Sequence, residues 1–201
     1  MPGENSFGIF AHLKDQPILA PGAVRYRGEA VLALVGTRAA VEAVDAADSP
    51  IAWQPQDAIA GIDAALADDA PLLHAHAAGN ILTRGYLECG DVAAGHAAAP
   101  PTAEGTFGTS FVEHAYIEPE AGYALPVGAN PDTDPDKDPD RIEIWACTQA
   151  PHMDLEDVAR ALGVGKDRVR IIPSACGGGF GGKLDVSVQP LLAVAAWRLK
   201  R

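Results

Sequence analysis

Cysteine is scarce in this sequence, and its positions do not favour a metal centre. The three cysteines are Cys89, Cys147 and Cys176, and no two of them have CxxC spacing. Closed iron–sulfur and zinc sites usually draw on such closely spaced pairs, so we expect no metal site built from this chain alone. Scattered cysteines are typical of reduced thiols in a cytoplasmic protein, and the sequence predicts that location.

Basic residues and long apolar runs are also few. There are 15 Lys and Arg residues against 27 Asp and Glu residues, for a net charge of −12. An acidic surface repels phosphate backbones, which argues against a nucleic-acid partner. The run from Leu191 to Trp197 is much shorter than the ~20 residues that cross a bilayer, and the N-terminus does not resemble a signal peptide. We therefore expect no membrane partner.

Strand and helix patterns are both present, and together they predict an α+β fold. In residues 1–65, apolar runs at 23–27, 31–35 and 51–53 favour strands, and Thr37 is a candidate N-cap for a helix over 38–47. Residues 62–67 favour a short helix and 81–88 a strand. Residues 66–104 are treated as a connecting segment, because 91–104 are rich in Ala, Gly and Pro.

Residues 105–201 carry the clearest periodicities. Residues 111–117 favour an extended segment, 141–146 alternate between apolar and polar side chains, and 169–172 favour a buried strand. A helix is predicted over 154–162, with Asp154 as its N-cap and Gly163 as its terminator. A last helix is predicted over 187–199, with Pro190 in its first turn.

The strongest candidate site is the glycine loop, defined here as residues 177–182, with the sequence Gly-Gly-Gly-Phe-Gly-Gly followed by Lys183. A glycine-rich loop between a strand and a helix lets backbone amides converge on an anion. Two nucleotide-binding patterns fit in part, but Leu184 stands where a Walker A loop needs a Ser or Thr hydroxyl for magnesium. A small P-loop-like nucleotide-binding domain is therefore one alternative. A turn that only lets two elements pack closely is another.

Three weaker candidates have simpler explanations. Alternate aspartates from Asp132 to Asp140 followed by Glu143 imitate an EF-hand loop, but Lys137 replaces the required glycine. We interpret this run as a solvated hairpin loop. In an extended strand, His114 and Glu118 would lie about 13 Å apart, so we expect structural polar contacts from them. Cys176 next to the glycine loop is expected to be a buried thiol.

These elements, taken in order, resemble the xanthine dehydrogenase and aldehyde oxidase family. The resemblance rests on residues 24–29 (Val-Arg-Tyr-Arg-Gly-Glu), 113–119 (Glu-His-Ala-Tyr-Ile-Glu-Pro), 148–151 (Thr-Gln-Ala-Pro) and 177–183. It implies a partial α/β hammerhead domain over 1–65, followed after 66–104 by the beginning of a mixed α/β molybdopterin-binding domain over 105–201.

The resemblance also implies the cofactor, the reaction and the site residues. The cofactor is a molybdenum–molybdopterin centre, and the reaction is oxidative hydroxylation of a small molecule with oxygen from water. Gly178, Gly179, Phe180, Gly181 and Gly182 are the expected cofactor-binding residues, and Phe180 also positions the substrate. Iron–sulfur clusters, with FAD as a further candidate, belong to partner domains or subunits. No protein ligand to the metal is expected here.

Two departures and one expected absence bear on the activity. Val112 replaces a glutamine, and Leu184 replaces a glutamate that contacts the purine in xanthine-type members. An aldehyde or another N-heterocycle is therefore expected as substrate. No catalytic residue is expected in this chain, because the family's base lies in sequence beyond Arg201. We therefore expect one part of a molybdenum subunit that is inactive alone, with a non-catalytic remnant or interaction module as the alternative.

Overall fold

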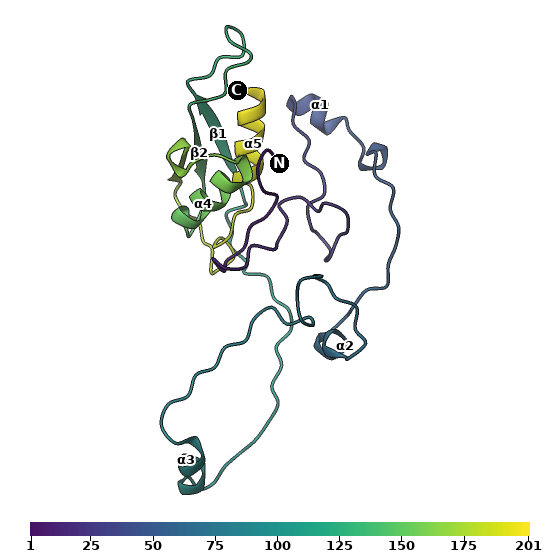
Figure 1. Cartoon of the computed structure of the whole chain (residues 1–201), viewed down its shortest axis with the longest axis vertical. Helices are drawn as coiled ribbons and strands as arrows, with labels where there is room; N and C mark the ends of the chain where they lie inside the picture. The colour runs from purple at the N-terminus through teal and green to yellow at the C-terminus, as the bar shows by residue number, and fades with distance from the viewer. The chain divides into compact units, whose positions relative to one another are not determined.

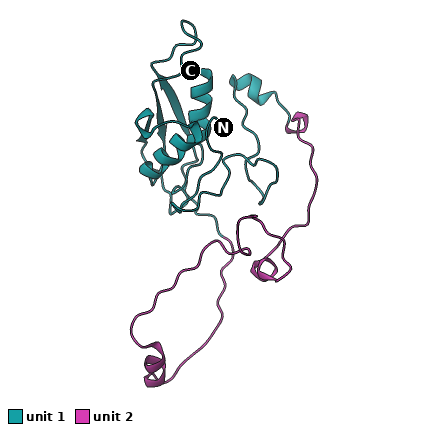
Figure 2. Ribbon diagram, in the orientation of Figure 1, with its two compact units in different colours: residues 1–45, 112–201 teal, residues 46–111 magenta.

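The computed structural model describes all 201 residues, which form two compact units. One unit contains residues 1–45 and 112–201, and the other contains residues 46–111 (Figure 2). Helices and strands are mixed, which is consistent with the predicted α+β class. No helix is both long and apolar enough to cross a membrane.

The first unit is built on a three-stranded sheet in the order β1-β2-β3. β1 (Gly122–Val127) and β2 (Arg141–Ala146) are antiparallel, whereas β2 and β3 (Val169–Pro173) are parallel. The predicted strands at 141–146 and 169–172 are confirmed. β1 was not predicted, because Pro126 and Gly122 weaken its strand pattern. A proline is nevertheless tolerated in an edge strand, and β1 is one edge of this sheet.

Two helices, α4 (Pro151–Leu162) and α5 (Gln189–Leu199), pack against each other and against the sheet (Figure 1). The alternation of β2 places Ile142, Ile144 and Ala146 in a buried core with side chains from both helices. On the alternate positions, the rings of Tyr123 and Trp145 stack with their centroids 4.8 Å apart. The sheet therefore has one face covered by helices and one face carrying a half-exposed aromatic pair.

The start of α4 corrects one prediction. Its N-cap is Ala150, and Pro151 occupies the first turn, where its missing N–H costs nothing. Asp154 was predicted as the N-cap but lies inside the helix, with no exposed surface. The predicted end is confirmed, since Gly163 adopts the left-handed conformation with φ of 71°.

Burial of Asp154 predicts an unusual pH dependence of stability. Burial, reinforced by the nearby Asp157 and Asp185, raises the pKa of Asp154 from 3.8 to about 6, and its Oδ1 has no hydrogen-bond partner. The folded state therefore holds this proton more tightly than the unfolded chain does. Its contribution to stability is complete below about pH 4 and is lost as the pH rises through about 6.

Asp154→Asn should therefore be more stable than the parent chain at pH 7.5, by about 2 kcal/mol, and nearly equal to it at pH 4. Urea unfolding at the two pH values measures this difference. Asp157→Asn is the matched control. It removes a buried carboxylate that is paired with Lys14 at 3.1 Å and with Arg160 at 3.0 Å, and it should destabilise the chain at pH 7.5. A loss of stability in both variants would contradict the prediction.

Most of the predicted structure before Gly122 does not form as predicted. Thr37 does cap a helix, since its side chain accepts from the Ala40 amide. However, α1 (Arg38–Glu42) is shorter than predicted and is followed by a separate 3₁₀ helix, η1 (Ala46–Asp48). The short helix α2 (Ile62–Leu66) agrees with the sequence, and α3 (Val92–Ala98) lies in the predicted connecting segment.

The strands predicted at 23–27, 31–35, 51–53 and 81–88 are wrong. Residues 111–117, predicted to be extended, also form no ladder, and Ala115 among them has a positive φ of 58°. Of the described residues before Gly122, only Phe7 with Gln16 and Phe10 with Leu13 form bridges, and both are isolated. A strand exists only through ladder hydrogen bonds to a partner, and these apolar runs have no partner within the chain.

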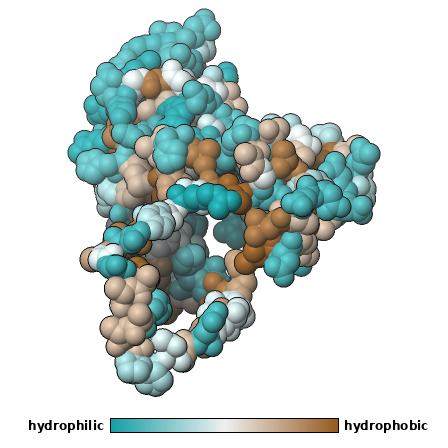
Figure 3. Space-filling model, turned by 60° about the horizontal axis from the view of Figure 1, so that its bottom comes forward, coloured by the Kyte–Doolittle hydropathy of each residue, from teal (hydrophilic) through white to brown (hydrophobic).

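Residues 46–111 contain no buried residue. Large apolar side chains are exposed there, including Leu87 at 96% and Phe107 at 94%, and Figure 3 shows apolar surface among hydrophilic residues on one face of the molecule. Exposed apolar surface on this scale is typical of a segment that is covered by other protein.

The aspartate-rich run forms the loop between β1 and β2, as the hairpin interpretation predicted. Val127 pairs with Arg141 at its base, and β1 and β2 flank it in place of the two helices of an EF-hand. A second 3₁₀ helix, η2 (Lys166–Arg168), precedes β3.

Candidate functional site

Sheet register brings the glycine loop beside the end of β2. Because β2 and β3 are parallel neighbours, both strands lead out at the same edge of the sheet. The Ser174 amide still donates to the Ala146 carbonyl at 3.1 Å. The residues after Ala146 and the loop after Pro173 are therefore neighbours, although about 30 positions separate them in sequence.

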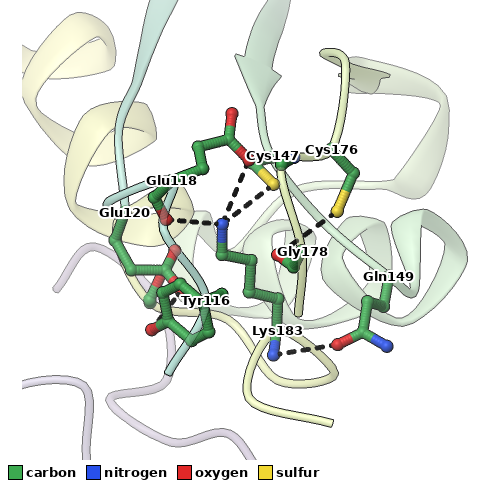
Figure 4. A network of polar contacts seen from close by, with 10 residues as sticks. Tyr116, Glu118, Glu120, Cys147, Gln149, Cys176, Gly178 and Lys183 are labelled. Carbon is green, nitrogen blue, oxygen red and sulfur yellow. Dashed lines mark hydrogen bonds and ion pairs between the residues drawn. The ribbon is translucent and has the colours of Figure 1, made fainter. Parts of the chain in front are cut away.

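Gln149 fastens the glycine loop from one side. Its side-chain Oε1 accepts from the backbone amides of Gly181 at 3.1 Å and Lys183 at 3.2 Å (Figure 4). Its backbone amide donates to the Lys183 carbonyl at 2.9 Å. A Cβ atom at Gly179 would lie 2.3 Å from this Oε1. Gly179 therefore lets the loop approach Gln149. Gln149 was noted in the sequence only within the stretch 148–151 that resembles the family, and no role was predicted for it.

The buried side chain of Lys183 holds the loop against the protein interior. Its side chain is 1% exposed, and its Nζ donates to the Glu118 carbonyl at 3.0 Å, to Glu118 Oε2 at 3.2 Å and to Cys147 Sγ at 3.2 Å. The same ammonium lies 4.3 Å from the centre of the Tyr116 ring, within cation–π range. These contacts tie the loop to residues 116–118, which Figure 4 shows around the lysine.

The pKa values of Glu118 and Cys147 are shifted in opposite directions. A hydrogen bond from Cys147, the amide of Gly177 at 2.7 Å and the Lys183 ammonium lower the pKa of Glu118 to about 2. Burial, followed by the hydrogen bond to Glu118, raises the pKa of Cys147 to about 11. At neutral pH the site therefore holds a carboxylate, a neutral thiol that donates to it, and an ammonium. The polar contacts expected of Glu118 are present.

Glycine is needed at further positions of the loop. Gly178 and Gly181 have φ angles of 111° and 96°, which L side chains rarely adopt. A Cβ atom at Gly182 would lie 2.8 Å from the Tyr116 ring and 3.1 Å from the His114 ring. Close packing against protein side chains therefore explains part of the glycine content, as one of the alternatives predicted.

The tip of the loop remains available to a ligand. No hydrogen bond in the described chain uses the amides of Gly178, Gly179 or Phe180. Phe180 has a positive φ of 52° and is 73% exposed. Unpaired amides beside an exposed ring fit an anionic group with oxygen acceptors. This donor set suits the oxygen ligands of the cofactor that the resemblance implies.

The structure does not favour the P-loop alternative. α5 begins at Gln189, six residues after Lys183, so no helix N-terminus follows the loop directly. The ammonium of Lys183 is buried against Glu118 and Cys147, whereas a P-loop lysine must reach the phosphates.

The two substrate-side positions predicted from the sequence both carry apolar side chains that are not buried. Val112 is 74% exposed and Leu184 is half-buried. Cys176 corrects a prediction, because it is exposed, while Cys147 is the buried thiol near the loop. The segment of Cys176 leaves the sheet after β3, which accounts for this exposure.

Comparison with known proteins gives a consistent result. The family model of the molybdopterin cofactor-binding domain matches residues 73–201. The nicotinate dehydrogenase large molybdopterin subunit of Eubacterium barkeri is 34% identical over all of this chain and 44% of its own length. A probable xanthine dehydrogenase subunit of Bacillus subtilis is 31% identical over all of this chain and 25% of its own length.

A putative xanthine dehydrogenase molybdenum-binding subunit of Escherichia coli K12 is 33% identical over 88% of this chain and 22% of its own length. The chain thus spans less than half the length of each of these relatives. The match of the family model, which covers well over half of the chain, and the relatives confirm the resemblance seen in the sequence. The chain belongs to the molybdopterin cofactor-binding domain family, within the xanthine dehydrogenase group of molybdenum proteins.

Proposed function

We propose that this chain supplies part of the cofactor site of a molybdenum hydroxylase, an oxidoreductase that hydroxylates an aldehyde or N-heterocycle with oxygen from water. One observation carries the proposal. The loop is held from two sides by Gln149 and Lys183, yet the amides of Gly178, Gly179 and Phe180 remain without protein acceptors.

The residues of the chain would act by positioning. The bound molybdenum–molybdopterin centre would supply the two-electron oxidation chemistry. The amides of Gly178, Gly179 and Phe180 would donate to its anionic oxygen atoms, and the fixed loop would present them without reorganisation. Gly181 and Gly182, whose amides are already bonded within the protein, would serve the loop conformation. The exposed Phe180 ring offers a flat apolar surface for a planar substrate.

The apolar side chains at the two proposed substrate-side positions favour a substrate with few polar groups. Val112 and Leu184 cannot donate or accept hydrogen bonds through their side chains, so purine recognition by these positions is not expected. The nicotinate dehydrogenase relative supports an N-heterocycle as one candidate, and an aldehyde is the other.

The remaining assignments follow from the family. We propose a partial hammerhead domain at 1–65, a connecting segment at 66–104 and part of the molybdopterin-binding domain at 105–201. The catalytic base and the other cofactor contacts would come from the remainder of the molybdenum subunit. Iron–sulfur subunits, with FAD as a further candidate, would accept the electrons. The exposed apolar side chains of residues 46–111 support such partners. We propose a cytoplasmic location, and we expect the chain alone to be inactive.

The test is molybdenum and pterin content, measured by elemental analysis and pterin fluorescence, on the chain expressed alone and with the remaining subunit sequence. We expect cofactor only in the co-expressed complex. Gly178→Ala should reduce molybdenum content roughly tenfold, because a strained φ and a crowded Phe180 ring cost about 1–3 kcal/mol. Gly95→Ala, at a helix position with open space around it, is the matched control and should leave the molybdenum content unchanged.

Two results would contradict the proposal. A co-expressed complex without molybdenum would support the non-catalytic remnant instead. Oxidation of an aldehyde or N-heterocycle by the purified chain alone, with a dye as electron acceptor, would show that the chain needs no further segment.

A further inference from the structure

Two cysteines that are distant in sequence meet next to the glycine loop. Cys147 follows β2 and Cys176 follows β3, and the parallel register of these strands brings the two segments together. Their sulfur atoms and a carboxylate oxygen of Glu118 all lie within 4.8 Å of one another. Both thiols are free (Figure 4). No role in the proposed hydroxylation requires either of them.

We propose that Cys147 and Cys176 form a reversible disulfide when the protein meets a hydroperoxide, and that this bond is a redox-sensitive tether of the glycine loop. A disulfide brings its sulfur atoms to about 2.05 Å. The present separation leaves only a short movement, and Cys176 lies in an exposed segment that is free of the sheet ladder.

The two cysteines differ in a way that assigns the order of reaction. Cys176 is exposed, and its sulfur donates to the Gly178 carbonyl at 3.5 Å and also interacts with the Cys147 thiol. It meets hydrogen peroxide first: its sulfur attacks one peroxide oxygen, the O–O bond breaks, the thiol proton passes to the leaving oxygen, and a sulfenic acid and water result. Cys147 is 2% exposed, and its sulfur then attacks the sulfenic sulfur. The S–O bond breaks, and the thiol proton of Cys147, which is hydrogen-bonded to Glu118, leaves with the hydroxyl group as a second water. Two electrons pass from the two sulfurs to the peroxide, so the step is balanced.

A metal ion fits this cluster less well than a disulfide does. The Lys183 ammonium lies 3.2 Å from both Cys147 Sγ and Glu118 Oε2, which puts a positive charge against two of the three candidate ligands. Coulomb repulsion at this distance disfavours a second cation. The same ammonium does not hinder a bond between two sulfurs, because the disulfide is neutral.

The bond would act on the loop tip. Cys176 immediately precedes Gly177, and moving its sulfur toward Cys147 breaks its contact with the Gly178 carbonyl. Gly178 carries one of the three unpaired amides, so oxidation at Cys176 would alter the ligand-facing part of the loop.

The experiment treats the reduced full chain with hydrogen peroxide, blocks remaining thiols under denaturing conditions, and maps peptides by mass spectrometry. We expect one linked pair of peptides containing Cys147 and Cys176, with the mass of two hydrogens lost, and its complete reversal by dithiothreitol. Cys89→Ser, which removes the third and exposed cysteine, should form the bond unchanged. Cys147→Ser and Cys176→Ser should not form it.

Other oxidation products would overturn the proposal. Cys147 that remains fully open to the blocking reagent while Cys176 accumulates as sulfinic acid would show that the two sulfurs do not meet. A bond that includes Cys89 or joins two chains would do the same. Because the decisive peptide map is made on the unaltered chain and without cofactor, its outcome is independent of molybdenum content.

Discussion

Lys183→Met should lower the free energy of unfolding of the chain by about 3 kcal/mol, because it leaves the Glu118 carboxylate without its buried cation. Methionine keeps most of the side-chain volume but donates no hydrogen bond. Nζ now serves two oxygen atoms of Glu118 and the sulfur of Cys147. The Glu118 side chain is 31% exposed, so water compensates for part of the lost interaction. The expected destabilisation is therefore at the lower end of the range for breaking a buried ion pair.

Urea unfolding followed by circular dichroism measures this loss, and proteolysis of residues 174–183 reports whether the loop opens. Lys166→Met is the matched control. It removes the ion pair with Glu156, whose partners are 63% and 49% exposed, and surface pairs of this kind contribute about 0–1 kcal/mol. A double-mutant cycle with Glu118→Gln isolates the coupling. If the two lysine variants lowered the free energy of unfolding equally, burial of Lys183 would contribute nothing to stability.

Ile144→Ala should destabilise the chain by about 2–5 kcal/mol, because it removes fully buried methyl and methylene groups and leaves a cavity. Ile144 is 0% exposed at the centre of β2, where both helices contribute to its core. The same strand leads directly into Cys147 and Gln149, so the variant should also speed hydrogen exchange of the Gly181 and Lys183 amides that Gln149 holds.

Thermal and urea unfolding measure the first effect, and exchange monitored by NMR measures the second. Ile117→Ala is the control, since Ile117 is 95% exposed and exposed substitutions usually change stability by less than about 0.5 kcal/mol. If Ile144→Ala lost stability while the two amides kept their protection, the core and the loop would be independent.

The sequence predicted the second half of the chain better than the first, for a physical reason. The alternation of residues 141–146 and the helical period of residues 154–162 report directly which side chains are buried, and β2 and α4 confirm them. Apolar runs such as 31–35 have the composition of strands, but a ladder also needs a partner. In the described structure, Leu32 and Leu34 remain 49% exposed, and no strand pairs with them.

The candidate site shows the same limit. The glycine loop was visible as a local motif, whereas the contacts that hold it join Glu118 to Lys183 and Gln149 to Gly181, across 65 and 32 positions. No periodicity reports such contacts. The position of Gln149 within the stretch that resembles the family was the one available signal. The exposure of Cys176 could not be predicted either, because it depends on where β3 ends.

The loop between β1 and β2 is a suitable place to insert a tag into this protein. Its base is fixed where Val127 pairs with Arg141, while Gly122 pairs with Ala146 at the other end of the sheet, the end from which Cys147 and Gln149 leave. Lengthening a loop whose ends are already held costs little, since closure entropy grows only with the logarithm of length. Residues 131–134 are therefore a permissive insertion point for an affinity tag or a fluorophore, which would report on partner assembly while leaving the glycine loop untouched.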